Sequence, residues 1–416
     1  NSLVEVFADD MSLGTVTADT TGSWSLADSA ITLSDGTYAI TAVARDQAGN
    51  VSSTSEPLSI TVDTTPDDPE PPPSDGTRRQ PADPLYLSQW HLNLLDDQGD
   101  SEWAIEKIWS EYTGDGVSVG IYDDGVEYSH SDLDDNYDAT RHLSYLGEVL
   151  DAAPTTSEEG KHGTAVAGVI GAEANGEGSV GIAFDASLTG VNIFTGPANI
   201  NELNPDGYTA VANEQYRFDV LNHSWGSLPA YINDTTEAIV ATLDGWQRAT
   251  TEGRDGYGSN IVKAAGNNAD DAHGDALNNS RFAIIVGAHD WEGDASWYTN
   301  RGPSLLVSAP TSGNTWDGDL RIITTDRQGG EGYAPGDYSA TDQTGFGGTS
   351  SAAPAVSGVI ALMLEANPEL GWRDVQTILS YSAHGLGTYD GPLENPSETI
   401  PVDEDGDGAV DYYETL

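Results

Sequence analysis

The proline-rich segment TTPDDPEPPPSDGTRRQPA, residues 64–82, constrains the fold of this 416-residue chain more than any other feature. Proline fixes its own φ and offers no backbone N–H, and the charges between these prolines oppose burial. The segment therefore predicts a semi-rigid linker that belongs to no core. It divides the chain into a part before residue 64 and a part that begins at residue 83.

Residues 1–63 read as a small all-β module. The segments GSWSLAD, GTYAITAVARD and PLSITVD alternate apolar and polar residues, and Asp, Gly and Asn punctuate them. The stretch DGTYAITAVARDQAGNVS resembles the immunoglobulin-like repeats of large bacterial surface and adhesin proteins. We expect an incomplete immunoglobulin-like module that lacks its first strand and serves as a spacer or an adhesive unit.

The pattern changes in residues 83–392. Short β-branched runs such as GVSVGIYD, NIVKAAG and FAIIVGA alternate there with helical stretches. This alternation predicts an α/β domain with a doubly wound parallel sheet and flanking helices. Residues 393–416 form an acidic, turn-rich tail.

The charge and composition exclude several functions. Fifteen basic residues stand against 68 acidic ones, a net charge of −53, which repels nucleic acid and anionic lipid and attracts cations such as Ca²⁺. Solubility in a salty medium explains most of these carboxylates equally well. There is no cysteine, and no stretch approaches the roughly 18 apolar residues of a membrane span. Because the chain opens at Asn1 in strand-like sequence without a signal peptide, we expect a mature form or a fragment of a longer surface protein.

Four short segments carry candidate chemistry. FGGTSSAAPAV sets Ser350 at the start of an apolar helix behind two glycines, and a strand in VSVGIYDDGVEYSHSDL ends at Asp123. KHGTAVAGVIGA places His162 at a helix entrance, and the strand in NIVKAAGNNAD stops just before Asn267. Taken singly, these residues are a helix cap, a turn aspartate, a surface histidine and a turn asparagine.

Taken together, the four residues supply what acyl transfer requires. A serine hydroxyl is a poor nucleophile unless an imidazole takes its proton and a carboxylate orients that imidazole. The amide of Asn267 and the backbone N–H of Ser350 could stabilise an oxyanion, helped by the positive end of the helix. The sequence therefore predicts a hydrolase with a Ser-His-Asp triad.

The order Asp123, His162, Ser350 is that of the subtilisins. The segments YDDGVEYSHSDL, HGTAVAGVIGA, LNHSWGS, AAGNN and GGTSSAAP resemble the successive signatures of subtilisin-superfamily serine peptidases. DPLYLSQWHL and LEANPELGWRDVQTILSYSA are similar to the kexin/furin-like branch. The resemblance implies a secreted or cell-surface serine endopeptidase in which Asp123 orients, His162 is the general base, Ser350 is the nucleophile and Asn267 completes the oxyanion hole.

The same resemblance implies residues that bind a protein or peptide substrate. Three residues would pair with its backbone and wall the first specificity pocket: Ser224, Trp225 and Gly226. Three acidic residues would favour basic side chains before the scissile bond: Asp275 in that pocket, and Asp124 and Glu159 in the next. Asn300 stands where this branch carries a glutamate, so broad subtilisin-like cleavage is the alternative. An adhesin with an inactive peptidase-like domain is the alternative from another class.

Two segments resemble calcium sites. The loop EANGEGS is similar to the structural calcium loop of the superfamily. This implies ligands from the loop and from two carboxylates outside it: Glu173, Asn175, Glu177, Ser179, Asp132 and Asp83. The tail DEDGDGAVDYYE matches the EF-hand loop pattern. Its candidate ligands are Asp403, Asp405, Asp407, Asp411 and Glu414. A glycine-rich surface loop, a single Asp-rich repeat and a disordered acidic tail are the alternatives.

Overall fold

The computed structural model describes residues 2–9, 11–18, 24, 36–46, 48–62, 80–93, 105–154, 160–194, 205–226, 236–313, 320–342, 344–383, 399–402 and 412–415. The chain forms two compact units, Asn1–Gly76 and Thr77–Leu416, and their division falls inside the predicted linker. The predicted limits at residues 63, 83 and 392 stay predictions. Each unit is described by itself.

The first unit is an antiparallel sheet. Its strands are β1 (Leu3–Ala8), β2 (Met11–Thr17), β3 (Gly36–Arg45) and β4 (Leu58–Val62), in the order β2-β1-β3-β4. Val4 and Val6 alternate along β1 and pack with Ala18 in a small core. The alternating segments at 36–46 and 57–63 form strands as predicted, whereas most of GSWSLAD lies outside the described residues.

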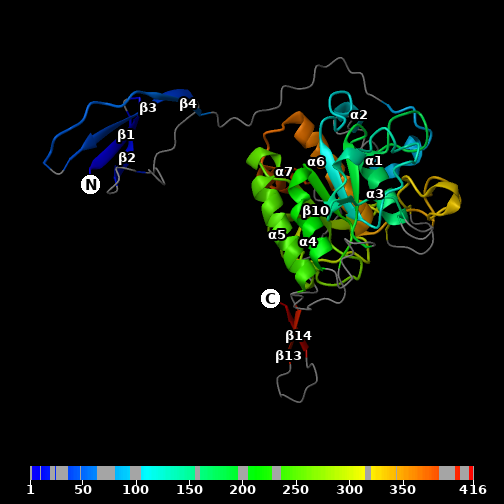
Figure 1. Ribbon diagram of the computed structural model, residues 1–416. Helices are drawn as coiled ribbons and strands as arrows, with labels where there is room; N and C mark the ends of the chain where they lie inside the picture. The colour runs from blue at the N-terminus through cyan, green and yellow to red at the C-terminus, as the bar shows by residue number, and fades with distance from the viewer. Residues whose placement is uncertain are drawn as a thin grey trace. The chain divides into compact units, whose positions relative to one another are not determined.

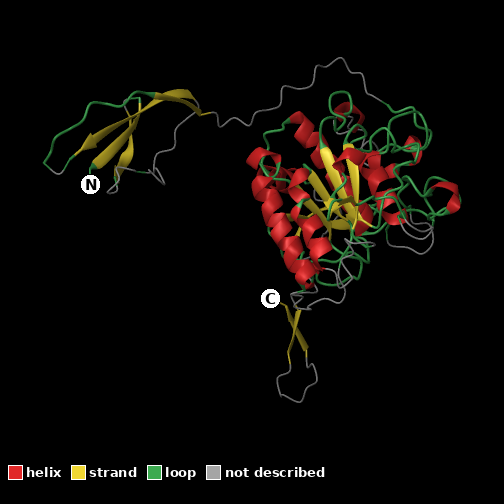
Figure 2. Ribbon diagram, viewed as in Figure 1, coloured by secondary structure: helices red, strands yellow, loops and turns green. Residues whose placement is uncertain are grey.

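The second unit is built on a six-stranded sheet (Figure 2). Its order is β12-β11-β10-β9-β5-β8, and every pairing in it is parallel. The strands are β5 (Ser118–Asp123), β8 (Ser187–Asn192), β9 (Val220–His223), β10 (Asn260–Ala264), β11 (Ala283–His289) and β12 (Leu305–Pro310). The parallel α/β prediction is therefore confirmed, and three of its β-branched runs are β5, β10 and β11.

Helices cover both faces of this sheet. α3 (Lys161–Gly171) and α6 (Thr349–Ala366) pack in one core with Val262 and Ala264, while α4 (Pro205–Asn213) and α5 (Glu237–Glu252) pack in another with Ile261. In Figure 1, α4 and α5 run together along one side of this unit. Alternate side chains of β10 thus serve opposite layers, as the pleat of a strand requires.

Shorter elements complete the second unit. They are α1 (Trp90–Asn93), α2 (Ile105–Ile108), α7 (Trp372–Ser382), the pair β6 (Ser144–Tyr145) and β7 (Glu148–Val149), and the pair β13 (Thr399–Val402) and β14 (Tyr412–Thr415). By length and composition α6 could cross a membrane, although no apolar stretch of that length was predicted from the sequence. However, 72% of it is buried inside this unit, so it is explained as a core helix.

The order of the sheet decides which side chains meet. β10, β9 and β5 are neighbours, and parallel strands end at the same edge of a sheet. Asp123 ends β5, Ser224 follows β9, and Asn267 follows β10 by three residues. Residues from three distant parts of the sequence therefore gather at one edge, where open α/β sheets hold their ligands.

Candidate active site

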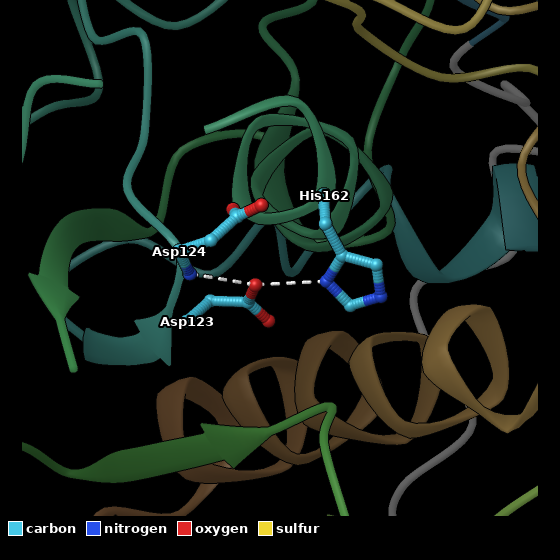
Figure 3. Close-up of side chains that lie close together, drawn as sticks. All are labelled: Asp123, Asp124 and His162. Carbon is cyan, nitrogen blue, oxygen red and sulfur yellow. Dashed lines mark hydrogen bonds and ion pairs between the residues drawn. The ribbon is translucent and has the colours of Figure 1, made fainter. Parts of the chain in front are cut away.

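Asp123 and His162 form a hydrogen-bonded pair at this edge. Asp123 is 1% exposed, and its Oδ1 lies 2.8 Å from Nδ1 of His162, the second residue of α3 (Figure 3). The backbone N–H of Asp124 donates to the same oxygen at 2.8 Å. Gly163 lets α3 approach β5, since a Cβ there would collide with the carbonyl oxygen of Gly125. The carboxylate therefore fixes the imidazole and leaves its Nε2 for another partner.

The electrostatics of this pair involve a third group. Burial lowers the pKa of His162, but Asp123 and Asp124 outweigh it and raise the pKa to about 9. Burial and then Asp123 raise the pKa of Asp124 to about 7, while His162 lowers it. Asp124 was predicted to contact a substrate side chain. In the structure it is half-buried beside the pair, and its Oδ1 accepts from the Gly163 N–H at 2.7 Å.

Ser350 is the second residue of α6 and is tied to Ser224. Its Oγ donates to the Ser224 carbonyl oxygen at 3.0 Å, so in this conformation it is not bonded to His162. Ser224 Oγ donates in turn to the Ser350 carbonyl oxygen at 3.1 Å. That carbonyl is available because Pro354, four residues further along α6, has no N–H. The imidazole of His162 lies near the start of α6, since its ring is in edge contact with that of Phe346, just before α6, with 5.4 Å between the ring centroids.

The adjacent serine has a different environment. Ser351 is 1% exposed, its Oγ lies 2.5 Å from Thr311 Oγ1, and it donates to the Gly348 carbonyl oxygen at 3.0 Å. These bonds anchor the first turn of α6 and hold the hydroxyl inside the protein. Ser350 is also buried, at 8% exposure, and the assignment of Ser350 as the nucleophile stays a prediction.

Asn267 is held with its amide nitrogen free to face the site. Its Oδ1 accepts from the Thr349 backbone N–H at 2.8 Å and from Thr349 Oγ1 at 2.9 Å. Gly348 precedes this turn with φ of 81°, and a Cβ on it would lie 2.9 Å from Asn267 Nδ2. Asn267 itself is exposed. An amide donor therefore stands beside the N-terminus of α6, where an oxyanion would be stabilised.

The predicted pocket contains an ion pair that the sequence reading missed. Ser224 is buried, Trp225 is half-buried and Gly226 is exposed after β9. A Cβ built on Gly226 would lie 3.6 Å from Asp275 Oδ2 and 3.8 Å from Lys263 Nζ. Those two atoms are 3.5 Å apart, and burial lowers the pKa of Lys263, against the effect of Asp275. A lysine within the apolar strand NIVKAAG was the available signal, because a buried ammonium needs a partner.

The carboxylates of Asp83 and Asp132 both accept hydrogen bonds from the loop 173–179. Asp83 Oδ1 accepts from the Gly176 N–H at 3.0 Å, and Asp132 Oδ2 accepts from the Ser179 N–H at 3.0 Å. The other oxygen of each, Asp83 Oδ2 and Asp132 Oδ1, is buried with no hydrogen-bond partner among the described residues. Burial raises the pKa of Asp132 to about 8 and also raises that of Asp83. Two buried carboxylate oxygens without hydrogen-bond donors among the described residues fit a hard cation such as Ca²⁺.

The remaining predicted loop ligands shape the loop itself. Asn175 Oδ1 accepts from the Glu177 N–H at 2.8 Å and so curls the loop. Glu173 Oε1 accepts from the Asp135 N–H at 2.7 Å, which leaves its backbone oxygen as the predicted ligand. Asn300 is bonded to backbone groups of Ala265, Asn268 and Asp270.

Several predicted residues fall outside the described part of the chain. These are Glu159, Asp403, Asp405, Asp407 and Asp411. Glu414 lies in β14 and is paired with Ile400 of β13. The segments that flank the acidic loop are therefore strands of one hairpin and not the helices of an EF-hand.

The site thus combines a buried aspartate bonded to a histidine with a serine at the start of a nearby helix and an amide beside that serine. This set of groups is typical of hydrolases that use a serine nucleophile. Residues 114–410 match the subtilase family, Peptidase_S8, and the chain belongs to this family of serine endopeptidases. Residues 1–64 match the bacterial Ig-like domain family.

Relatives agree with this assignment. Furin-like protease 2 of Drosophila melanogaster is 34% identical over 315 residues, which are 72% of this chain and 18% of that protein. A dibasic-processing endoprotease of Schizosaccharomyces pombe is 33% identical over 324 residues, 76% of this chain and 41% of that protein. The crystal structure of the serine protease of Aeromonas sobria superposes with a TM-score of 0.62 at 25% identity, covering 77% of this chain and 61% of that one. The chain thus matches less than half the length of both sequence relatives.

Proposed function

We propose that this protein is a serine endopeptidase that cleaves protein substrates through an acyl-enzyme on Ser350. The observation that carries the proposal is the 2.8 Å contact between His162 Nδ1 and Asp123 Oδ1, beside the start of α6. His162 acts as general base, Asp123 orients it, and Asn267 donates to the oxyanion.

The reaction begins with a rotation about χ1 of Ser350. The hydroxyl leaves the Ser224 carbonyl and turns toward His162 Nε2, which takes its proton as Oγ attacks the scissile carbonyl carbon. Asn267 Nδ2 and the Ser350 N–H stabilise the oxyanion of the tetrahedral intermediate. His162 then gives the proton to the leaving amine as the C–N bond breaks. Water then attacks the carbonyl carbon of the ester as His162 takes a proton from it. His162 returns this proton to Ser350 Oγ as the ester bond breaks.

Fluorophosphonate labelling tests this proposal. The native chain should be labelled on Ser350 and should hydrolyse peptides, and Ser350→Ala should abolish labelling and lower kcat by about 10⁶-fold. Ser110→Ala, which removes an exposed hydroxyl just after α2, is the control, and Ser351→Ala should still be labelled on Ser350 although it removes bonds that anchor the first turn of α6. Undiminished hydrolysis by Ser350→Ala would overturn the proposal. A native chain that binds a protein partner without being labelled would favour the adhesin alternative.

We propose broad cleavage over a preference for basic residues. The name of the dibasic-processing relative and the presence of Asp275 favour basic side chains before the scissile bond. The contact of Lys263 with that aspartate argues against it, because the charge is already paired. A panel of peptides ending in Arg, Leu or Phe before the scissile bond separates the two.

We propose that Ca²⁺ stabilises the second unit. Its ligands would be the carboxylates of Asp83 and Asp132, the side chain of Asn175, and backbone oxygens of the loop 173–179. The support is the pair of buried carboxylate oxygens without donors, whose repulsion a cation would neutralise. The ion would act on stability and take no part in peptide cleavage. The acidic tail is a second candidate calcium site. We also propose that the protein acts outside the cell, because calcium is plentiful there and a bacterial Ig-like domain fits a surface protein.

A further inference from the structure

We propose that Lys263 is a specificity-determining residue that occupies the acidic floor of the first pocket in place of a basic substrate side chain. Cleavage then stays broad among uncharged side chains and discriminates against Arg and Lys. The inference rests on the proposed peptidase function and names the substrate class of that same site.

Lys263 is buried near the carboxyl end of β10, at the sheet edge that carries Asp123 and Asn267. It is the fourth residue of β10 and is 0% exposed. Its Nζ donates to the Trp225 carbonyl oxygen at 3.1 Å and to the Ala264 carbonyl oxygen at 3.3 Å, and it lies 3.5 Å from Asp275 Oδ2. An ammonium has three protons, and three acceptors surround it. Lys263 is therefore a fixed cation that joins the segments after β9 and β10.

Gly226 opens the way to this ion pair. It is exposed, and a Cβ on it would stand 3.6 Å from Asp275 Oδ2 and 3.8 Å from Lys263 Nζ. The side chains of Lys263 and Asp275 are 0% and 9% exposed, so they lie directly behind Gly226, and a substrate side chain that packs over this glycine would come close to both. A cation on that side chain would approach the carboxylate and the Lys263 ammonium together.

The charges at the pocket floor therefore cancel. Asp275 Oδ1 accepts from the Leu277 N–H at 2.8 Å, and Oδ2 faces Lys263. The guanidinium of a substrate arginine that bound Asp275 Oδ2 would lie close to the positively charged Lys263 ammonium at a buried site. Repulsion between these two cations is strongly unfavourable. An uncharged side chain meets no such repulsion, and the aromatic ring of Trp225, in edge contact with Phe194 at 6.2 Å, offers it an apolar wall.

The test compares peptides that differ only in the residue before the scissile bond. For the full chain, kcat/KM should be at least about tenfold higher for Leu than for Arg. Lys263→Met keeps the length and removes the charge, so the Arg-to-Leu ratio should rise by about 100-fold. Asp275→Asn leaves Lys263 without its carboxylate, so peptides with Glu at this position should gain relative to Leu. Lys107→Met, which removes a lysine of α2, is the control and should leave every ratio unchanged.

Labelling of Ser350 separates the two proposals. A native chain that is not labelled overturns the peptidase function. A labelled chain that cleaves the Arg peptide as well as the Leu peptide overturns only the role of Lys263, and so does Lys263→Met that is labelled with an unchanged ratio. If Lys263→Met does not fold, the native ratio and the Asp275→Asn profile still decide the question.

Discussion

Asp124 follows Asp123 directly, and Figure 3 shows its backbone nitrogen bonded to the Asp123 carboxylate while its own carboxylate lies beside the helix that carries His162. Ligand atoms of Asp123, Asp124 and His162 all lie within 4.8 Å of one another. Asp124 is one of the groups that raise the pKa of His162 to about 9. A general base must be neutral, so kcat/KM should rise with pH through the pKa of His162 in the free enzyme.

Asp124→Asn should move this rise to lower pH by roughly one unit. The substitution removes the negative charge and keeps an oxygen that can accept from the Gly163 N–H, so the cation form of His162 loses support without loss of the turn. The measurement is kcat/KM against pH on one uncharged peptide. Asp244→Asn, on the exposed face of α5, is the control and should leave the profile in place. An unshifted profile for Asp124→Asn would show that its charge does not reach the imidazole.

Residue identity alone carried much of the site. Asp123, His162, Ser350 and Asn267 were predicted from their segments, and the structure brings Asp123 to His162 and Asn267 to α6. The bonds between Ser224 and Ser350 could not be predicted, because they depend on a side-chain rotamer and on β9 meeting α6. The partner of Lys263 was hidden for a similar reason, since twelve residues separate it from Asp275.

At the scale of elements, the N-terminus of α6 organises the oxyanion donors. Gly348 has φ of 81° and ψ of 175°, a conformation that is essentially confined to glycine and that costs another residue roughly 1–3 kcal/mol, and a Cβ here would also lie 2.9 Å from Asn267 Nδ2. Gly348→Ala should therefore displace the amide and lower kcat by on the order of 10²- to 10³-fold. The strain should also lower the unfolding free energy by roughly 1–3 kcal/mol.

Gly147 provides a matched control for this prediction. Its φ is 84°, and nothing lies within 4 Å of a Cβ built there. Gly147→Ala also places a side chain at a positive φ and should keep its kcat. Thermal unfolding and initial rates are measured on both variants. Equal kcat values for the two variants would contradict a role for the contact between residue 348 and Asn267 in catalysis.

Elements were predictable where their pattern is local. β-branched runs predicted β5, β10 and β11, and alternation predicted β3 and β4. The order β12-β11-β10-β9-β5-β8 was not predicted, since parallel neighbours are joined by long crossovers and their pairing depends on the whole core. The strands that flank the acidic tail loop were missed because TIPV and YYET are too short to show a period.

At the scale of the whole molecule, the net charge of −53 means that a buried, ionised carboxylate without a nearby cation destabilises the fold. The fold brings Asp83, near the start of the second unit, together with Asp132 and the loop 173–179. Burial raises the pKa of Asp132 to about 8, above its unfolded value of about 4. Between these values the metal-free fold binds more protons than the unfolded chain, so its stability falls as pH rises through this window.

Calcium should reverse this dependence, because a bound ion holds the carboxylates ionised in the folded state. In a Ser350→Ala background, which prevents autolysis, saturating Ca²⁺ should add about 3 kcal/mol of unfolding free energy. The rise in Tm should be larger at pH 8 than at pH 5. Asp132→Asn should lose this gain, yet in chelator at pH 8 it should equal or exceed the parent, since no charge is left to desolvate. Asp185→Asn, at an exposed position, should respond to calcium as the parent does. A calcium site here would be contradicted if Ca²⁺ left the Tm unchanged at both pH values, or if Asp132→Asn gained as much stability from Ca²⁺ as the parent. The buried carboxylates would then be stabilised by protonation.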